Sequence, residues 1–372
     1  MASGFSEKAV QELRELLDRF EYHRTGELPA YSTRAVFPLR ELERYLQYRR
    51  GENDPLWGTA FPSRYHGRFG RSHPLCLELY QLFFLHRELT PSPPLADALA
   101  RLTEHGLVRR DRDRFLALVQ VTSLWGRYLI SSVPGRGGEG FVYLGDDSAQ
   151  LGRLARRECP RGGRGRALDM CCGCGVVAIT LPAGFDEVLG VDVDPLCLEY
   201  AEANLRLNGL DRIRFRPSDV WTEVDGRFQL ILGNPPALFL PNQEEREMLF
   251  ARGGGEYGTE LFARVVEGLE AHLELGGVAL LLGFAPCPGG QDLLCRRIQD
   301  LLGPALSLDY TVLESIGLAD EQVPRVHRVE VRIARDGRGR RNILHRSMAE
   351  RLKGFSLPFL DPESSPQAGR LR

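Results

Sequence analysis

The chain has 372 residues, of which 43% are hydrophobic and 26% charged, and its formal net charge is −2. This length favours two domains, and the near-neutral charge excludes a global attraction to nucleic acid or anionic membranes. The most apolar stretch, 277–283, is far shorter than the ~20 residues that span a bilayer. The eight cysteines are scattered, which indicates free thiols. We expect a cytoplasmic, soluble protein without a membrane partner; nothing in the sequence indicates its oligomeric state.

Residues 1–135 are predicted to form a smaller, mostly helical domain. Helices are expected at 5–20, 39–48, 74–89 and 95–105, the last ending at Gly106. A charged turn at 110–113 then separates two strand-like segments, of which the second covers 115–121. Helices followed by a two-stranded wing are typical of a winged-helix module, and we expect this domain to cover or select a substrate.

A linker with an entry helix is predicted at 136–165, and a Pro- and Ser-rich flexible tail at 351–372. Between them, strands and helices alternate over 166–350, which predicts an α/β domain with a seven-stranded, Rossmann-like parallel sheet. Strands are expected near 166–170, 187–192, 212–216, 228–233, 277–284, 307–313 and 326–333. Helices are expected near 175–182, 195–208, 259–274 and 290–302. The last strand is expected to continue through the turn at Asp336-Gly337 into a hairpin over 342–345.

The first strand of this domain leads into a glycine-containing loop that suits a nucleotide cofactor. Asp169 is followed by Cys171, Cys172, Gly173 and Gly175, and the glycines allow a sharp turn close to a ligand. Asp192 ends the next strand, 19 residues after Gly173, where an acid typically binds the two ribose hydroxyls; Val193 follows it. Because Ala178 replaces the third glycine of a dinucleotide loop, the pattern favours a nucleoside with an amino-acid tail.

Two further segments complete the predicted site. Asp219 is placed to accept from an adenine amino group, with Val220 and Trp221 against its rings; a helix cap and ordinary core packing are the respective alternatives. At the end of the fourth strand, Asn234, Pro235 and Pro236 form a stiff corner. The Asn side-chain oxygen and the Pro235 carbonyl can grip a planar amino or amide nitrogen.

Together these segments resemble the class I methyltransferases that use S-adenosyl-L-methionine (SAM). They are most similar to the Asn-Pro-Pro group, which includes glutamine N-methyltransferases of release factors and ribosomal protein and guanine N-methyltransferases of ribosomal RNA. The resemblance implies SAM as cofactor, catalysis at Asn234, Pro235 and Pro236, and a substrate mouth near Asp147 and Tyr257. The sequence departs from this group at Cys171, which replaces a glycine. It also departs at Ala237, which replaces an aromatic residue whose role Phe239 could take.

We therefore predict a SAM-dependent methyltransferase acting on a nitrogen of a small metabolite or natural product, or of a protein side chain. Ribosomal RNA ranks behind these because of the neutral charge and Ala237. Two alternatives remain open: an enzyme that turns SAM on itself, and a winged-helix regulator that only binds SAM. No metal is expected, because the Cys171–Cys174 pair has no partner pair and the histidines are scattered. An arginine run over 332–346 could bind phosphate or form a solvated sheet edge.

Overall fold

The computed structural model describes residues 5–23, 74–84, 86–133, 140–159, 165–236, 255–317 and 321–345. They form two compact units, with the boundary between Leu144 and Gly145. The helix expected at 39–48, the tail at 351–372, and Ala237 and Phe239 lie outside the described residues. No helix in the described part is both long enough and apolar enough to cross a membrane.

The first unit begins with α1 (Glu7–Arg19), which the sequence predicts from its apolar stripe. Leu13 and Leu17 on that stripe are fully buried, and the Ser6 hydroxyl caps the helix by accepting from the Ala9 N–H at 3.2 Å. Two more helices follow, α5 (Pro74–Phe83) and α6 (Pro93–Glu104). Gly106 has a φ of +73° just beyond α6, as expected of a helix stop.

Two antiparallel hairpins follow these helices. The predicted charged hairpin is confirmed: β1 (Val108–Asp111) pairs with β2 (Arg114–Ala117). The strand expected over 115–121 is instead divided, and its second half belongs to a hairpin of β3 (Val119–Leu124) and β4 (Arg127–Ser132). The winged-helix class of this unit stays a prediction.

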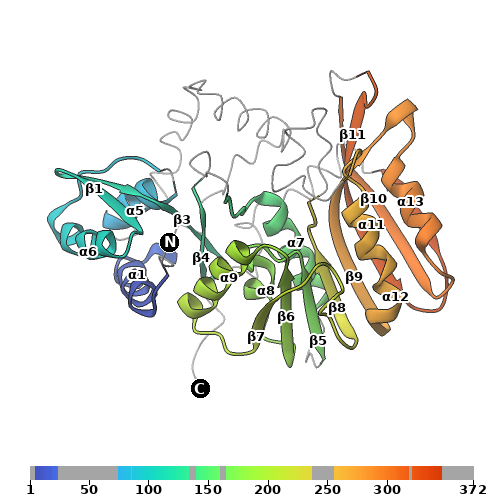
Figure 1. Cartoon of the computed structure of the whole chain (residues 1–372), viewed down its shortest axis with the longest axis horizontal. Helices are drawn as coiled ribbons and strands as arrows, with labels where there is room; N and C mark the ends of the chain where they lie inside the picture. The colour runs from blue at the N-terminus through green and yellow to red at the C-terminus, as the bar shows by residue number, and fades with distance from the viewer. Residues whose placement is uncertain are drawn as a thin grey trace. The chain divides into compact units, whose positions relative to one another are not determined.

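The second unit is built on one mixed sheet of eight strands, in the order β12-β10-β11-β9-β8-β5-β6-β7 (Figure 1). The strands are β5 (Arg166–Met170), β6 (Glu187–Asp192), β7 (Ile213–Pro217), β8 (Phe228–Gly233), β9 (Leu273–Pro286), β10 (Leu306–Gly317), β11 (Arg325–Arg335) and β12 (Arg341–His345). All pairs are parallel except those of β11, which runs antiparallel to both β9 and β10. The α/β prediction is confirmed, and the count of seven strands is corrected to eight.

The predicted hairpin at the end of the domain is wrong. β12 pairs with β10 in parallel, with Leu308 opposite Arg341, and not with β11. Both edges of β11 are already occupied, one by β9 and the other by β10, so no free edge remains for a strand that follows it closely. The chain therefore continues past β11 and β10 and adds β12 at the outer edge.

Helices cover both faces of the sheet, whose strand side chains alternate between them. The helices are α7 (Asp146–Glu158), α8 (Val176–Thr180), α9 (Pro195–Asn208), α11 (Glu260–Glu267), α12 (Leu269–His272) and α13 (Leu293–Leu301), with a 3₁₀ turn at Pro288–Gly290. The largest core cluster joins Phe262, Val265 and Leu294 of α11 and α13 to Leu168 and Val331 of the sheet. α7 packs on β8 and β9 and against α8, which contacts β5 and β6.

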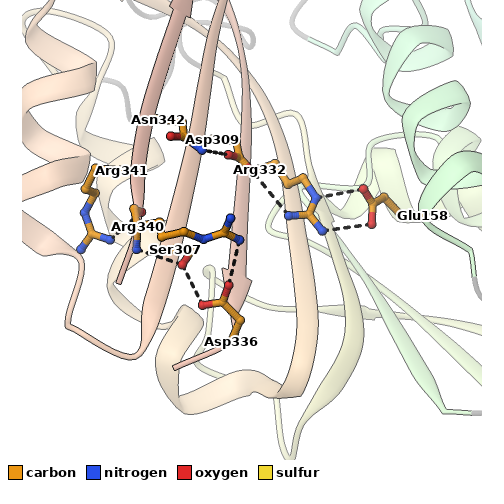
Figure 2. Close-up of polar contacts among 8 residues, drawn as sticks. All are labelled: Glu158, Ser307, Asp309, Arg332, Asp336, Arg340, Arg341 and Asn342. Atoms are coloured by element: carbon orange, nitrogen blue, oxygen red, sulfur yellow. Dashed lines mark hydrogen bonds and ion pairs between the residues drawn. The ribbon is translucent and has the colours of Figure 1, made fainter. Parts of the chain in front are cut away.

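The arginines near the end of the described chain are largely paired within the unit (Figure 2). Arg332 on β11 donates to Glu158 at the end of α7 at 2.9 Å and contacts Asp309 at 3.4 Å. Arg340 pairs with Asp336 at 3.2 Å, and Arg341 donates to backbone carbonyls. These contacts favour the reading of this run as a structural edge over phosphate binding, while Arg346 lies outside the described residues.

Candidate SAM site at the carboxyl edge of the sheet

The loop after β5 makes the tight turn that its glycines predict. Cys171, Gly173 and Gly175 have φ values of +56°, +53° and +74°. At position 175 a side chain is excluded for a second reason, because a Cβ there would lie 2.5 Å from the ring of Phe215 on β7. The loop backbone therefore stays close to the sheet and leads directly into α8.

Asp169, at the end of β5, fixes this loop through a hydrogen bond to the start of α8. Its carboxylate accepts from the Ala178 N–H at 2.9 Å, and the side chain is almost completely buried, at 2% exposure. Burial raises the pKa of Asp169 to about 8, with the nearby Asp192 carboxylate raising it further and the Ala178 N–H opposing the shift. Its observed contact is thus with the start of α8, and direct contact with a cofactor stays a prediction.

Asp192 lies where the sequence predicts it, at the end of β6 and against the loop. One carboxylate oxygen accepts from the Gly173 N–H at 2.8 Å and the other from the Asp194 N–H at 3.0 Å. Burial raises the pKa of this group as well. A carboxylate fixed in this way still has lone pairs for two hydroxyl donors. Val193 beside it is 68% exposed and free to face a ligand.

Asn204 on α9 is a supporting residue that the sequence shows only as part of a matching helix. Its side-chain N–H donates to the Cys174 carbonyl at 3.0 Å, and the residue is fully buried. The contact ties α9 to the loop after β5. Since the sequence separation is 30 residues, local periodicity gives no signal for it.

An open, shallow depression of about 480 Å³ lies beyond the ends of β6 and β7. Its lining residues are Val193, Arg216, Pro217, Ser218, Asp219, Thr222 and Glu223. Asp219 is exposed and forms an ion pair with Arg264 of α11 at 2.9 Å, a partner that no sequence pattern indicated. Ligands of open α/β sheets bind at this carboxyl edge, so the predicted adenine position coincides with this depression.

Trp221 and Val220 occupy more internal positions. The Trp221 indole N–H donates to the Arg264 carbonyl at 2.9 Å, and its ring stacks on His272 with centroids 4.5 Å apart. Val220 is buried in the main core. The observed contacts of both residues are those of core packing. Their contact with adenine stays a prediction.

Three carboxyl groups lie around the loop, those of Asp169, Asp192 and Asp219. Burial raises the pKa of Cys171, and the carboxylates of Asp192, Asp169 and Asp219 raise it further. The Cys172 thiol is shifted upward for the same reasons, and burial raises the pKa of Cys174 to about 12. These thiols are therefore protonated and poor nucleophiles at neutral pH. The carboxyl groups of Asp192 and Asp219 suit a cationic nucleoside such as SAM, which carries a sulfonium and an ammonium group, better than a pyrophosphate.

The Asn-Pro-Pro corner follows β8 directly and is joined to the start of α7. The Asn234 side-chain N–H donates to the Asp147 carboxylate at 2.9 Å. A carboxylate can only accept, so this contact fixes which end of the Asn234 amide faces Asp147 and turns the amide oxygen away from it. Asp147, predicted at the substrate mouth, thus contacts the predicted catalytic residue.

The remaining predicted substrate residues are less defined. Pro235 is buried and Pro236 is partly exposed. Tyr257 packs with Phe284 against the buried Val323 and Val326, a small cluster separate from the loop. Its role at the substrate mouth stays a prediction.

The strand order, the glycine loop after β5, the acid after β6 and the Asn-Pro-Pro corner after β8 agree with the resemblance to class I SAM-dependent methyltransferases that the sequence implies. Residues 153–272 match the family model described as "Methyltransferase small domain". This part of the chain therefore carries a SAM-dependent methyltransferase domain of that kind. SAM is accordingly the cofactor of this domain.

Named relatives match over the same part of the chain. A putative protein N5-glutamine methyltransferase of Methanocaldococcus jannaschii is 34% identical over 31% of this chain and 59% of its own length. A release factor glutamine methyltransferase of Thermodesulfovibrio yellowstonii is 28% identical over 31% of this chain and 45% of its own. A ribosomal RNA small subunit methyltransferase C of Shewanella loihica is 33% identical over 31% of this chain and 30% of its own length.

The chain thus spans less than two thirds of the length of these relatives. Among solved structures, a ribosomal protein L11 methylase of Lactobacillus delbrueckii subsp. bulgaricus matches 51% of this chain and 79% of its own, at 20% identity and a TM-score of 0.35.

Proposed function

We propose that the chain transfers a methyl group from SAM to an amide nitrogen of a protein side chain. The observation that carries this proposal is the hydrogen bond between Asn234 and Asp147. It presents the Asn234 oxygen as a fixed acceptor at the carboxyl edge of the sheet, beside the Pro235 carbonyl. Two acceptors on adjacent residues suit the two N–H groups of a primary amide.

When bound, SAM supplies an electrophilic methyl group. The substrate nitrogen forms a bond to the methyl carbon, the carbon–sulfur bond breaks, S-adenosylhomocysteine leaves, and the nitrogen then releases a proton. Asn234 and Pro235 would hold both N–H groups and aim the lone pair. Alignment of this kind contributes several kcal/mol to rate acceleration without a strong base.

The relatives support an amide acceptor over a nucleobase. Two of them bear names that specify protein glutamine, whereas one is named for ribosomal RNA. The net charge of −2 also offers no broad cationic surface to an RNA backbone. A protein amide is therefore our first choice, with small-metabolite amides or amines second.

The direct test is incubation of the purified full chain with methyl-labelled SAM and host-cell extract separated into protein, RNA and small-molecule fractions. We expect label in the protein fraction, and mass spectrometry of peptides should locate it on a side-chain amide. Label in RNA, label in small molecules, SAM breakdown without an acceptor, or binding without turnover would each contradict this assignment.

Two variants test the role of the corner. Asn234→Ala should retain SAM binding and lose turnover, because the loop after β5 is unchanged.

Asp147→Asn should lower kcat about 10–100-fold with an unchanged KM for SAM, since an amide at 147 no longer fixes the orientation of Asn234. Glu158→Gln, which removes the same charge from the other end of α7, is the matched control and should keep kcat. Equal losses in Asp147→Asn and Glu158→Gln would contradict the positioning role.

A further inference from the structure

Cys287, Asp292 and His327 converge at the end of the sheet that also holds the carboxyl ends of the parallel strands. Cys287 directly follows β9, Asp292 precedes α13, and His327 lies on β11. The antiparallel register places Pro286 opposite Val326, and the Cys287 N–H donates to the Arg325 carbonyl at 2.8 Å. One sulfur, one nitrogen and one oxygen atom of the three side chains all lie within 4.8 Å of one another.

The carboxylate at the centre of this cluster is held from several sides. Asp292 caps α13 by accepting from the Cys295 N–H at 2.8 Å, and the Tyr310 hydroxyl donates to it at 2.9 Å. His327 contacts the same carboxylate through Nδ1 at 3.1 Å, and the Cys287 thiol donates to the Ala285 carbonyl at 3.5 Å. Supporting contacts of this kind orient the groups of a metal site before the ion arrives.

The cluster is shielded from solvent but reachable. Cys287 is 1% exposed, and the side chains of His327 and Asp292 are 11% and 18% exposed. Thiolate, imidazole and carboxylate are the three ligand types that zinc prefers in proteins. Zinc bonds of about 2.0–2.3 Å place tetrahedral ligand atoms roughly 3–4 Å apart, close to the spacing found here.

A Cys-His-Asp catalytic triad does not account for this geometry. In a triad the imidazole separates its two partners, with the nucleophile at one ring nitrogen and the carboxylate at the other. Here the sulfur lies within 4.8 Å of both the imidazole nitrogen and the carboxylate oxygen. The three atoms surround a common point instead of forming a line.

We propose that Cys287, Asp292 and His327 bind a Zn²⁺ ion, a site that the sequence did not predict. The fourth position is open to water or to His345 of β12, whose ring lies edge-on to the His327 ring with centroids 6.0 Å apart. Zinc displaces the protons that now occupy the thiol and the shared Nδ1–Asp292 hydrogen bond. The ion joins the end of β9, the start of α13 and β11 at the edge where the SAM loop lies.

The test is the metal content of the full chain, purified without chelator and after incubation with zinc chloride and desalting. We expect one zinc per chain by elemental mass spectrometry. Replacement of zinc by cobalt should give d–d absorption typical of tetrahedral geometry and a sulfur-to-cobalt charge-transfer band, which requires a cysteine ligand.

Variants assign the ligands. Cys287→Ser should lose the charge-transfer band and the bound zinc. Asp292→Asn should also lose zinc while it still caps α13, because Asn caps a helix about as well as Asp, so circular dichroism should show an intact fold. Cys159→Ser, a partly exposed cysteine outside the cluster, is the control and should retain both signals. Absence of zinc in the wild type, or a charge-transfer band that persists in Cys287→Ser, would overturn the proposal.

Discussion

Burial of the Asp169 carboxyl group lowers the free energy of unfolding at neutral and higher pH. A carboxyl group with 2% exposure is expensive to ionise, and its folded-state pKa of about 8 lies above the ordinary value of 3.8. Below both values the group is protonated in the folded and unfolded states alike. Between them the folded state binds the additional proton, so stability falls as the pH rises through this window.

We therefore expect the free energy of unfolding to fall between about pH 4 and 8, with one proton contributing a slope of about 1.4 kcal/mol per pH unit. Asp169→Asn keeps an acceptor for the Ala178 N–H but cannot ionise, so its slope should be smaller and its stability at pH 8 higher. Urea unfolding of the SAM-free protein across this range measures both. Asp211→Asn, on the exposed surface, should retain the wild-type slope, and parallel curves for wild type and Asp169→Asn would refute the explanation.

Arg340 and Arg341 show that neighbouring residues of equal charge act differently on the elements around them. Arg341 donates to the carbonyl of Leu302, the C-cap residue of α13, at 3.0 Å, and to those of Gly303 and Leu306 beyond the helix at 3.4 and 2.5 Å. Carbonyls at a helix end lack an intrahelical donor, so the contact with Leu302 supports the C-terminus of α13. Arg340 instead pairs with Asp336 on the surface, with its own side chain 55% exposed.

Loss of the cap should be visible in α13 alone. Arg341→Ala is expected to speed hydrogen exchange of α13 amides about tenfold, or about 1.4 kcal/mol, because the C-cap carbonyl of Leu302 loses its donor. Arg340→Ala removes the same charge and should change exchange by less than about threefold, as exposed ion pairs contribute little. Hydrogen exchange followed by mass spectrometry of α13 peptides distinguishes the two, and equal effects would indicate that charge, not capping, matters.

The sequence predicted the positions of individual strands well, but it predicted poorly which strands and side chains pair with one another. The strands expected at 166–170 and 228–233 coincide with β5 and β8, because each is an apolar run bounded by turn-forming or charged residues. The pairing of β12 with β10 depends on which sheet edge is free, and no local pattern encodes that. The same limit applies to the Asp219–Arg264 pair, 45 residues apart, and to the convergence of Cys287 with His327. The tight turn of the loop after β5 and the position of the corner after β8 could be predicted because each depends on contiguous residues.

For the whole molecule, the balance of 48 basic and 50 acidic residues bears on the acceptor. A protein that neutralises several phosphates releases the counterions bound to them. Its affinity falls steeply as the salt concentration rises, because this release becomes less favourable. With a near-neutral chain and the described arginines of β11 and β12 largely paired internally, we expect no such dependence.

Accordingly, kcat/KM for the protein acceptor should change by less than about threefold between about 50 and 200 mM salt, whereas six to ten phosphate contacts would give roughly a 10³–10⁵-fold loss. Steady-state methylation at constant pH and varied potassium chloride measures this. A steep decline would contradict this expectation and favour an acceptor that carries phosphate groups.

The position of β11 also constrains the order in which the chain can mature on the ribosome. β9 and β10 are synthesised before β11, yet β11 must enter between them and pair with both. Until residues 325–335 have left the exit tunnel, the inner edges of β9 and β10 have no native partner and expose hydrogen-bonding groups. The SAM-binding half, from β5 to β8, can form earlier, so nascent chains that stall within this interval should be the ones that require chaperones.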